Sequence, residues 1–297
     1  MFLAHVWSHL HLPSPTPIQE DIATYLEDGP RRLVIEAFRG IGKSYITSAY
    51  CCYCLLKDPE TKILVVSASK IRSDDFSTFT QRLILEMPVL QHLRSKDHQR
   101  HSKISFDVGP STPAHAPSVK SVGISGQMAG SRADLIIADD VEVPNNSMTQ
   151  GMRDRIAESV KEFDAILKPS GRVIFLGTPQ SEQTLYEVLP DRGYELKIWC
   201  AKVPGEKLKD RYGVRLSDYV LNHKGVEGSP TDPLRFDEMD LEERELSYGR
   251  AGFSLQFMLD TSLSDADRYP LKLHDLVVMD IPAEKGPQEV IAGRLNH

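Results

Sequence analysis

A glycine-rich octapeptide near the start of the chain has the composition of a phosphate-binding loop. The segment Ala37–Ser44, AFRGIGKS, directly follows an apolar run and opens a helix-like run. Gly40 and Gly42 let backbone N–H groups turn toward an anion, and the helix start adds the positive end of its dipole. The Lys43 ammonium can then reach the β- and γ-phosphates, and the Ser44 hydroxyl can hold Mg²⁺. The octapeptide therefore predicts a site for a nucleoside triphosphate.

One position departs from the usual form of such a loop, which has glycine where this chain has Ala37. Gly40, inside the loop, could supply part of the conformational freedom that is lost there. Taken alone, a Gly-Lys-Ser tripeptide could also be an ordinary connection between a strand and a helix. Other parts of the chain must decide between the two interpretations.

A second motif places acids at the end of an apolar strand. The segment Ala133–Glu142 reads ADLIIADDVE, and parallel strands deliver the side chains at their ends to the sheet edge where a phosphate loop lies. Asp139 could hold Mg²⁺ there, and Asp140 or Glu142 could orient and deprotonate the attacking water. An acidic turn without a catalytic role fits the same residues. Their position, one or more strand–helix units after Ser44, favours catalysis.

Three further segments carry polar groups that could reach the same edge. The run Arg172–Gln180 ends a strand near Thr178, whose hydroxyl could sense the γ-phosphate, although a plain strand-to-turn transition fits equally well. Gln19 offers an amide that could pair with an adenine edge. Ser67–Lys70 and Arg72 follow another strand, where they could hold the backbone phosphates of a nucleic acid.

Apolar runs alternate with helix-like stretches along most of the chain. Runs that are nearly continuous in apolar residues suit strands covered on both faces, with the helices as crossovers between parallel strands. We expect strands at 33–35, 63–67, 104–108, 122–124, 135–138 and 173–176, and helices at 45–56, 74–86 and 149–167. The predicted fold is α/β, with a mostly parallel sheet between layers of helices over about residues 15–200 and a small helical subdomain over 201–262.

The composition is that of an ordinary globular protein. A net charge of −7 over 297 residues argues against a protein that coats nucleic acid by bulk electrostatics. Cys51, Cys52 and Cys54 lack the spacing of metal ligands and indicate small buried side chains in a reducing compartment. No leader peptide and no run long enough to span a bilayer is visible, so we expect a soluble intracellular protein without a membrane partner.

Taken together, the motifs resemble the ATPase half of the large terminase subunits of tailed phages, most closely the DNA-packaging proteins (DNA maturase B) of T7-like podoviruses. The segments that carry the resemblance are Gln19, 39–44, 67–70, 104–110, 130–134, 136–142, 176–180, 230–233, 250–259 and 263–266. The resemblance implies an ASCE-type P-loop NTPase with a helical lid subdomain over 201–262, within an ATPase domain over 1–262. It also implies ATP as substrate and Mg²⁺ as cofactor.

The same resemblance implies a motor that pumps double-stranded viral DNA into a procapsid. Such motors assemble in the host cytoplasm as a homo-oligomeric ring, in this case a pentamer, on the portal protein, and they work with a small terminase subunit. Similar full-length proteins continue into an RNase-H-like nuclease domain that holds two metal ions. No strand bearing such acids follows Asp265. We therefore expect a truncated or split terminase without endonuclease activity, with 263–297 as the start of a linker.

The positions that match the terminase family imply roles for individual residues. Arg39 would sense or stabilise the γ-phosphate, and Thr178 would couple hydrolysis to movement. Relatives usually carry glutamate after the metal aspartate, where this chain has Asp140, so the base stays open between Asp140 and Glu142. The nucleotide-binding residues would be Gln19, Gly40, Ile41, Gly42, Lys43 and Ser44, with Ser44 and Asp139 as the Mg²⁺ ligands.

The arginine finger of many relatives, which acts on the ATP of a neighbouring subunit, corresponds to Ala129 in this chain. Arg132 is the nearest substitute, and it would stabilise the charge that spreads over the transferring phosphoryl group. A structural ion pair with Asp134 or a neighbour is the alternative. Two other functions stay open: a remnant that binds nucleotide or portal without hydrolysis, and another P-loop translocase such as a helicase-like enzyme.

Overall fold

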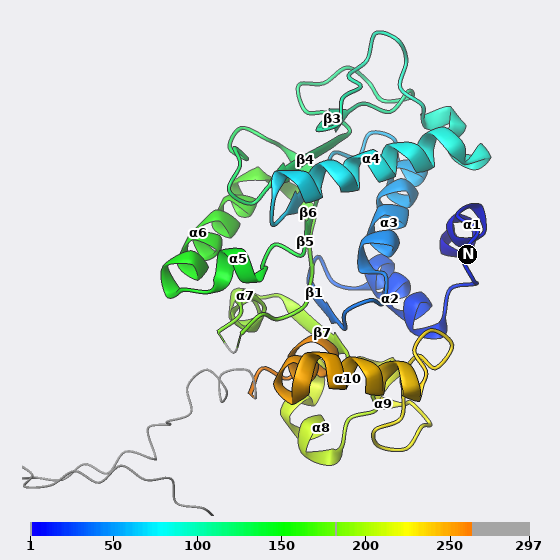
Figure 1. The fold of residues 1–297 in the computed structure, drawn as a ribbon. Coiled ribbons are helices and arrows are strands. Elements are labelled where there is room, and N and C mark those ends of the chain that lie inside the picture. The colour runs from blue at the N-terminus through cyan, green and yellow to red at the C-terminus, as the bar shows by residue number, and fades with distance from the viewer. Residues whose placement is uncertain (1, 182, 263–297) are drawn as a thin grey trace, which may run out of the picture.

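A twisted sheet of seven strands forms the centre of the computed structural model, which describes residues 2–181 and 183–262 (Figure 1). The strand order is β3-β4-β2-β5-β6-β1-β7, and every neighbouring pair is parallel except β3 with β4. The strands are β1 (Arg32–Ala37), β2 (Ile63–Ser67), β3 (Ser105–Phe106), β4 (Val119–Gly123), β5 (Ala133–Asp139), β6 (Leu167–Gly177) and β7 (Glu195–Trp199).

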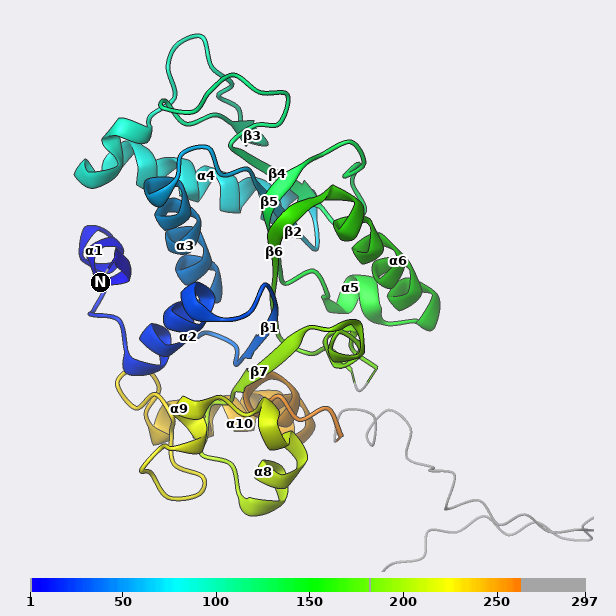
Figure 2. The same cartoon turned by 180° about the vertical axis from the view of Figure 1, so that it is seen from behind.

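Helices cover both faces of the sheet, as the continuous apolar strands require. Leu33, Val34 and Ile35 follow one another in β1, and all three are fully buried, which needs a covering layer on each face. Helices α1, α2, α3 and α4 lie on one side and α5, α6 and α7 on the other (Figures 1 and 2). Their bounds are α1 (Phe2–His9), α2 (Pro17–Asp28), α3 (Lys43–Lys57), α4 (Lys70–Glu86), α5 (Pro144–Ser147), α6 (Gln150–Ile166) and α7 (Leu185–Val188).

A helical segment follows β7 and lies beside that edge of the sheet (Figure 2). Its longest helix begins at a capping box, in which the Asp237 carboxylate accepts a hydrogen bond from the Asp240 amide at 2.8 Å. The segment contains α8 (Glu206–Tyr212), α9 (Asp218–Leu221), α10 (Glu238–Phe253) and the π-helical turn η4 (Ser254–Met258). The described residues also contain short 3₁₀ turns at η1 (Pro88–Leu93), η2 (Pro190–Arg192) and η3 (Gly213–Arg215).

The predicted α/β fold, with a mostly parallel sheet between helices, is confirmed. Several details differ from the sequence expectations. Among them, α1, α2, α5, α7 and β7 were not foreseen, and the strand expected at 104–108 is reduced to Ser105–Phe106. The linker expected at 263–297 lies outside the described residues. Within the described part of the chain, no helix combines the length and the apolar character needed to cross a membrane.

Candidate nucleotide-binding site

The glycine-rich loop connects β1 to α3, as predicted. Gly40 and Gly42 both have φ near 94°, a left-handed conformation that favours glycine, and Gly42 is the N-cap of α3. Ala37 is instead the last residue of β1 and pairs in register with Trp199 of β7. It has no positive φ, so the alanine fits where the usual motif has glycine.

Lys43 lies buried at the start of α3, with its ammonium turned back across the loop. The Nζ atom donates to the Ala37 carbonyl at 2.7 Å and to the Thr178 hydroxyl at 3.0 Å. Burial lowers the pKa of Lys43, while Asp140 and Asp139 oppose that change. Thr178, just beyond β6, also donates from Oγ1 to the Ala37 carbonyl at 3.2 Å. The two predicted residues therefore meet at the end of β1.

The strand order places Asp139 opposite the loop. β6 lies between β1 and β5, so the end of β5 faces the start of α3 across one intervening strand. The Ser44 hydroxyl donates to Asp139 Oδ2 at 3.1 Å, and Asp139 Oδ1 is buried without a partner among the described residues. Burial, with Asp140 as the second cause, raises the pKa of Asp139 to about 7. A hydroxyl beside a buried carboxylate with an unused oxygen fits the oxygen ligand set of Mg²⁺.

Asp140 and Glu142, the two candidates for the base, have different surroundings. Both acids line the cleft; the Asp140 side chain is 30% exposed, and its backbone has φ near 44°. Glu142 is 1% exposed. Its carboxylate accepts hydrogen bonds from the Thr184 hydroxyl at 3.0 Å and from the Leu185 amide at 2.7 Å, so it fixes the segment that opens α7. The arrangement leaves Asp140 as the acid available to a water molecule.

Lys43, Ser44, Asp140, Glu142 and Thr178 line a cleft of about 760 Å³, and Asp139 lines a neighbouring cavity. Three arginines also line this cleft: Arg39 from the loop, Arg72 from α4, and Arg235 from the segment before α10. Arg39 donates from Nη1 to Gln256 Oε1 at 3.2 Å, and Arg235 donates from Nε to the Gly40 carbonyl at 3.0 Å. The sequence analysis did not identify Arg235 or Gln256 as site residues.

Gln19 lies under the loop and does not line the cleft. Its Oε1 accepts from the Thr16 amide at 3.1 Å in the capping box of α2, and its Nε2 donates to the Ile41 carbonyl at 2.7 Å. At 1% exposure, this amide is engaged in positioning the loop, and its predicted contact with an adenine edge stays a prediction. The sequence pattern Thr-x-x-Gln, with proline at the first helical position, is the signal for that role.

Arg132 lies at the opposite edge of the sheet. It immediately precedes β5, whose other end carries Asp139, and it lines a different cavity together with Ile63 at the start of β2. Its Nη1 donates to the Ser131 carbonyl at 2.9 Å. Asp134 instead pairs with Lys168 at 2.8 Å and accepts a hydrogen bond from the Lys62 amide at 2.9 Å, and no ion pair of Arg132 is seen among the described residues. Arg132 therefore does not reach its own chain's loop, and an action on a neighbouring subunit stays a prediction.

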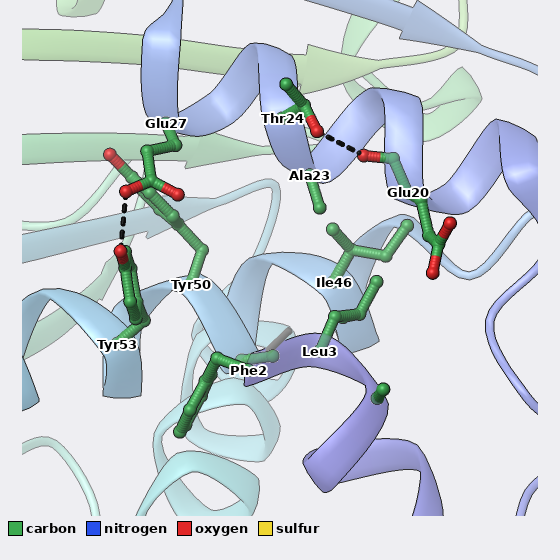
Figure 3. Close-up of a pocket in the computed structure, with 11 residues that line it drawn as sticks. Phe2, Leu3, Glu20, Ala23, Thr24, Glu27, Ile46, Tyr50 and Tyr53 are labelled. Carbon is green, nitrogen blue, oxygen red and sulfur yellow. Dashed lines mark hydrogen bonds between the residues drawn. The ribbon is translucent and has the colours of Figure 1, made fainter.

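A second cavity, of about 370 Å³, lies between α1, α2 and α3 (Figure 3). Phe2, Leu3 and Ile46 supply apolar surface, and Glu20 and Glu27 supply carboxylates. The Tyr53 hydroxyl donates to Glu27 at the edge of this cavity. None of the lining residues is cationic, so the chemistry of this cavity does not suit a phosphate group.

Glu36, the residue before Ala37, is a buried acid outside the cleft. Neither of its carboxylate oxygens has a hydrogen-bond partner among the described residues. Burial raises the pKa of Glu36 from 4.5 to about 8. The charged groups that act on it are Glu187 and Glu142, which add to the rise, and Arg215 and Lys43, which oppose it.

Glu36 should make the stability of the protein fall as the pH rises. Its folded-state pKa is raised, so its contribution is fully present below 4.5 and is lost as the pH passes through about 8. We expect the unfolding free energy of the wild type to fall between these values by a few kcal/mol more than that of Glu36→Gln. Urea unfolding at acidic and alkaline pH measures this difference, with the exposed Glu158→Gln as the control. Equal pH dependence of Glu36→Gln and the wild type would contradict the assignment.

The loop, the acids at the end of β5 and the intervening strand β6 define a P-loop NTPase fold of the ASCE type. The fold matches that of an ATPase domain mutant of the large terminase of Thermus phage P74-26, with a TM-score of 0.52, 15% identity, and coverage of 86% of this chain and 96% of that one. No family model matches the chain. It is 52% identical over 296 residues to the large terminase subunit of Enterobacteria phage T3.

This alignment makes the chain a homologue of phage terminase large subunits, because it covers 96% of the chain. The chain spans 50% of the length of that relative. The sequence resemblance to the terminase family is thus confirmed.

Proposed function

We propose that this chain is the ATPase of a phage DNA-packaging motor, which hydrolyses ATP with Mg²⁺ and moves double-stranded viral DNA into a procapsid. The observation that carries the proposal is the placement of Lys43 and Ser44 in one cleft, with Asp139 hydrogen-bonded to Ser44, in a chain 52% identical to a terminase large subunit. Residues 1–262 would form the ATPase domain, with 201–262 as its lid.

Four residues at or beside the cleft have roles in this reaction. Lys43 and the loop amides bind the β- and γ-phosphates, and Ser44 and Asp139 would hold Mg²⁺, which supplies charge neutralisation on the phosphate oxygens. Asp140 orients a water molecule and accepts its proton while the water oxygen bonds to the γ-phosphorus. The bond from that phosphorus to the β–γ bridging oxygen breaks, and ADP leaves with the electron pair.

The lid segment contacts the loop at three places that could transmit the reaction. Gln256 accepts a hydrogen bond from Arg39, and Arg235 donates to the Gly40 carbonyl. The ring of Phe236 lies against the loop, because a methyl group placed on Gly40 would approach that ring to 2.9 Å. Thr178, just beyond β6, is hydrogen-bonded to Lys43. Loss of the γ-phosphate would therefore change contacts of both β6 and the lid.

The proposed partners are double-stranded DNA, the portal protein, a small terminase subunit and further copies of this chain in a pentameric ring, all in the host cytoplasm. The −7 net charge leaves no bulk attraction to DNA. A motor of this kind should therefore grip DNA only when it is assembled in the ring.

Procapsids that bear a portal test the proposal. We expect the purified chain to hydrolyse ATP and to protect added double-stranded DNA from nuclease digestion when these procapsids are present. Thr178→Val should lower the length of DNA protected per ATP hydrolysed, by roughly 10-fold, because the variant loses the hydroxyl that joins Lys43 to β6. Procapsid binding without turnover would instead identify a remnant that only docks. Turnover that drives strand separation, without packaging, would favour a helicase-like translocase.

A further inference from the structure

Arg72 lies in the first turn of α4, at the same sheet edge as the acids. Helix α4 follows β2, whose last residue Ser67 pairs in register with Asp139 of β5. The helix start is held close to the sheet, because a methyl group on Gly123 of β4 would lie 2.8 Å from the Lys70 amide nitrogen. The N-cap hydroxyl of Ser69 accepts a hydrogen bond from the Arg72 amide at 3.4 Å. These contacts fix the position from which the Arg72 side chain extends.

The guanidinium of Arg72 extends toward the catalytic acids. Its Nη1 lies 3.7 Å from Asp140 Oδ2, which is close enough for an ion pair but too long for a hydrogen bond. The side chain is 52% exposed, and it lines both the nucleotide cleft and the small cavity next to Asp139. Arg72 is also one of the charges that lower the pKa of Asp139.

The other two arginines of the cleft are already hydrogen-bonded. Arg39 is bound to Gln256 and Arg235 to the loop backbone. Among the described residues, the Arg72 guanidinium makes no hydrogen bond and pairs only with Asp140 at 3.7 Å, so its N–H groups can still bind a ligand. Both Arg72 and Lys43 line the cleft, but Arg72 pairs with Asp140, whereas Lys43 is bound to Ala37 and Thr178. A terminal phosphate between the two would be contacted by cations from opposite sides.

The negative charges at the cleft explain why a cation at the position of Arg72 would help the reaction. Asp139 and Asp140 place two carboxylates beside a triphosphate, and like charges at this distance repel one another. Arginine suits planar, bidentate contacts with phosphate oxygens and stays charged in the site. A guanidinium next to Asp140 would compensate the negative charge that spreads over the equatorial oxygens during transfer.

We propose that Arg72 is a catalytic arginine that contacts the terminal phosphate of the nucleotide bound by its own chain, with Asp140 holding the guanidinium toward the cleft. This inference rests on the proposed ATPase function. It differs from the sequence interpretation of Arg72 as a contact for nucleic acid, and it provides a cation in the same subunit as the loop. Arg132 is not needed for that role.

Affinity for two nucleotides tests the contact directly, using the full chain. We expect Arg72→Ala to bind ATPγS with Mg²⁺ roughly 10-fold or more weakly than the wild type and to bind ADP with Mg²⁺ unchanged. Arg72→Lys should recover part of the ATPγS affinity. Arg82→Ala is the matched control, because Arg82 lies on the same helix, is 65% exposed, and among the described residues pairs only with Glu86. An equal loss for both nucleotides, or no loss, would overturn the proposal.

ATP turnover by a mixture of two variants shows whether Arg72 acts in its own subunit or on a neighbouring one. We expect Arg72→Ala to lower kcat by about 10²- to 10³-fold. Mixing it with Lys43→Ala should restore nothing, because no chain in the mixture then has both groups. Recovery on mixing would show an action on a neighbouring subunit, and a loss confined to DNA affinity would make Arg72 a DNA contact; either result overturns the proposal. A wild type without turnover would refute the ATPase function, whereas the ATPγS comparison would still test the contact.

Discussion

ATP turnover by Lys43→Ala is expected to fall by about 10³-fold or more. The Lys43 ammonium lies inside the loop, between the Ala37 carbonyl and the Thr178 hydroxyl, and it is the cation nearest the end of β1. Without this ammonium group, the loop keeps its backbone amides but loses the positive charge that would contact the β- and γ-phosphates during transfer. Phosphate release under saturating ATP and Mg²⁺ measures the effect.

Two control variants separate this loss from a loss of folding. Lys43→Met keeps most of the side-chain volume in a buried position and should be as inactive as the alanine variant. Lys57→Ala removes an exposed lysine at the other end of the same helix, where it pairs with Glu27, and should leave turnover unchanged. A folded Lys43→Met variant with wild-type turnover would contradict the role given to the loop.

Asp140→Asn is expected to lower kcat by about 10²- to 10⁴-fold while nucleotide affinity is retained. Asparagine has nearly the shape of aspartate and tolerates the positive φ at this position, so the backbone should not change. The amide cannot accept the proton of the attacking water. Single-turnover measurements with pre-bound ATP separate this effect on chemistry from any effect on binding.

The matched variant Glu142→Gln distinguishes the two candidate bases. Because Glu142 holds the Thr184 hydroxyl and the Leu185 amide, its replacement should weaken folding by about 1–2 kcal/mol and reduce turnover less than Asp140→Asn does. Turnover that survives Asp140→Asn and disappears in a folded Glu142→Gln variant would assign the base to Glu142 instead.

The loop and the acidic strand were readable from the sequence because their signals are local. The glycines at 40 and 42 and the lysine and serine that follow them are contiguous, and the apolar run before Asp139 ends in acids. Strand β7 was missed because it is a short edge strand in which charged Glu195 and Lys197 alternate with apolar residues. Such a five-residue pattern is weak in isolation.

The partners of Gln19 and Arg72 could not be read in the same way. A free glutamine suggested a contact with adenine, but the capping box at Thr16 uses one end of its amide and the loop uses the other. Arg72 reaches Asp140 because β2 and β5 are neighbours in the sheet. Strand order is a property of the tertiary fold, so this pairing has no signature in the local sequence.

The contacts between the C-terminal helical segment and the loop have the same origin. Arg235 and Gln256 bind loop residues about two hundred positions earlier in the chain. The sequence shows a charged, helix-favouring segment there, but it does not show which face meets the loop. A polar residue that acts across such a separation is found only when the packing of the segment is known.

Phosphate release from ATP by the purified wild-type chain, with and without Mg²⁺, tests the central claim most directly. We expect turnover that requires Mg²⁺, because Ser44 and the Asp139 oxygen that has no partner among the described residues would supply ligands for the cation beside the loop. Turnover should stop when the cation is chelated and return when it is restored. A folded chain that binds ATP in the presence of Mg²⁺ and releases no phosphate, alone or with portal-bearing procapsids and DNA, would contradict the assignment of this cleft as an ATPase site.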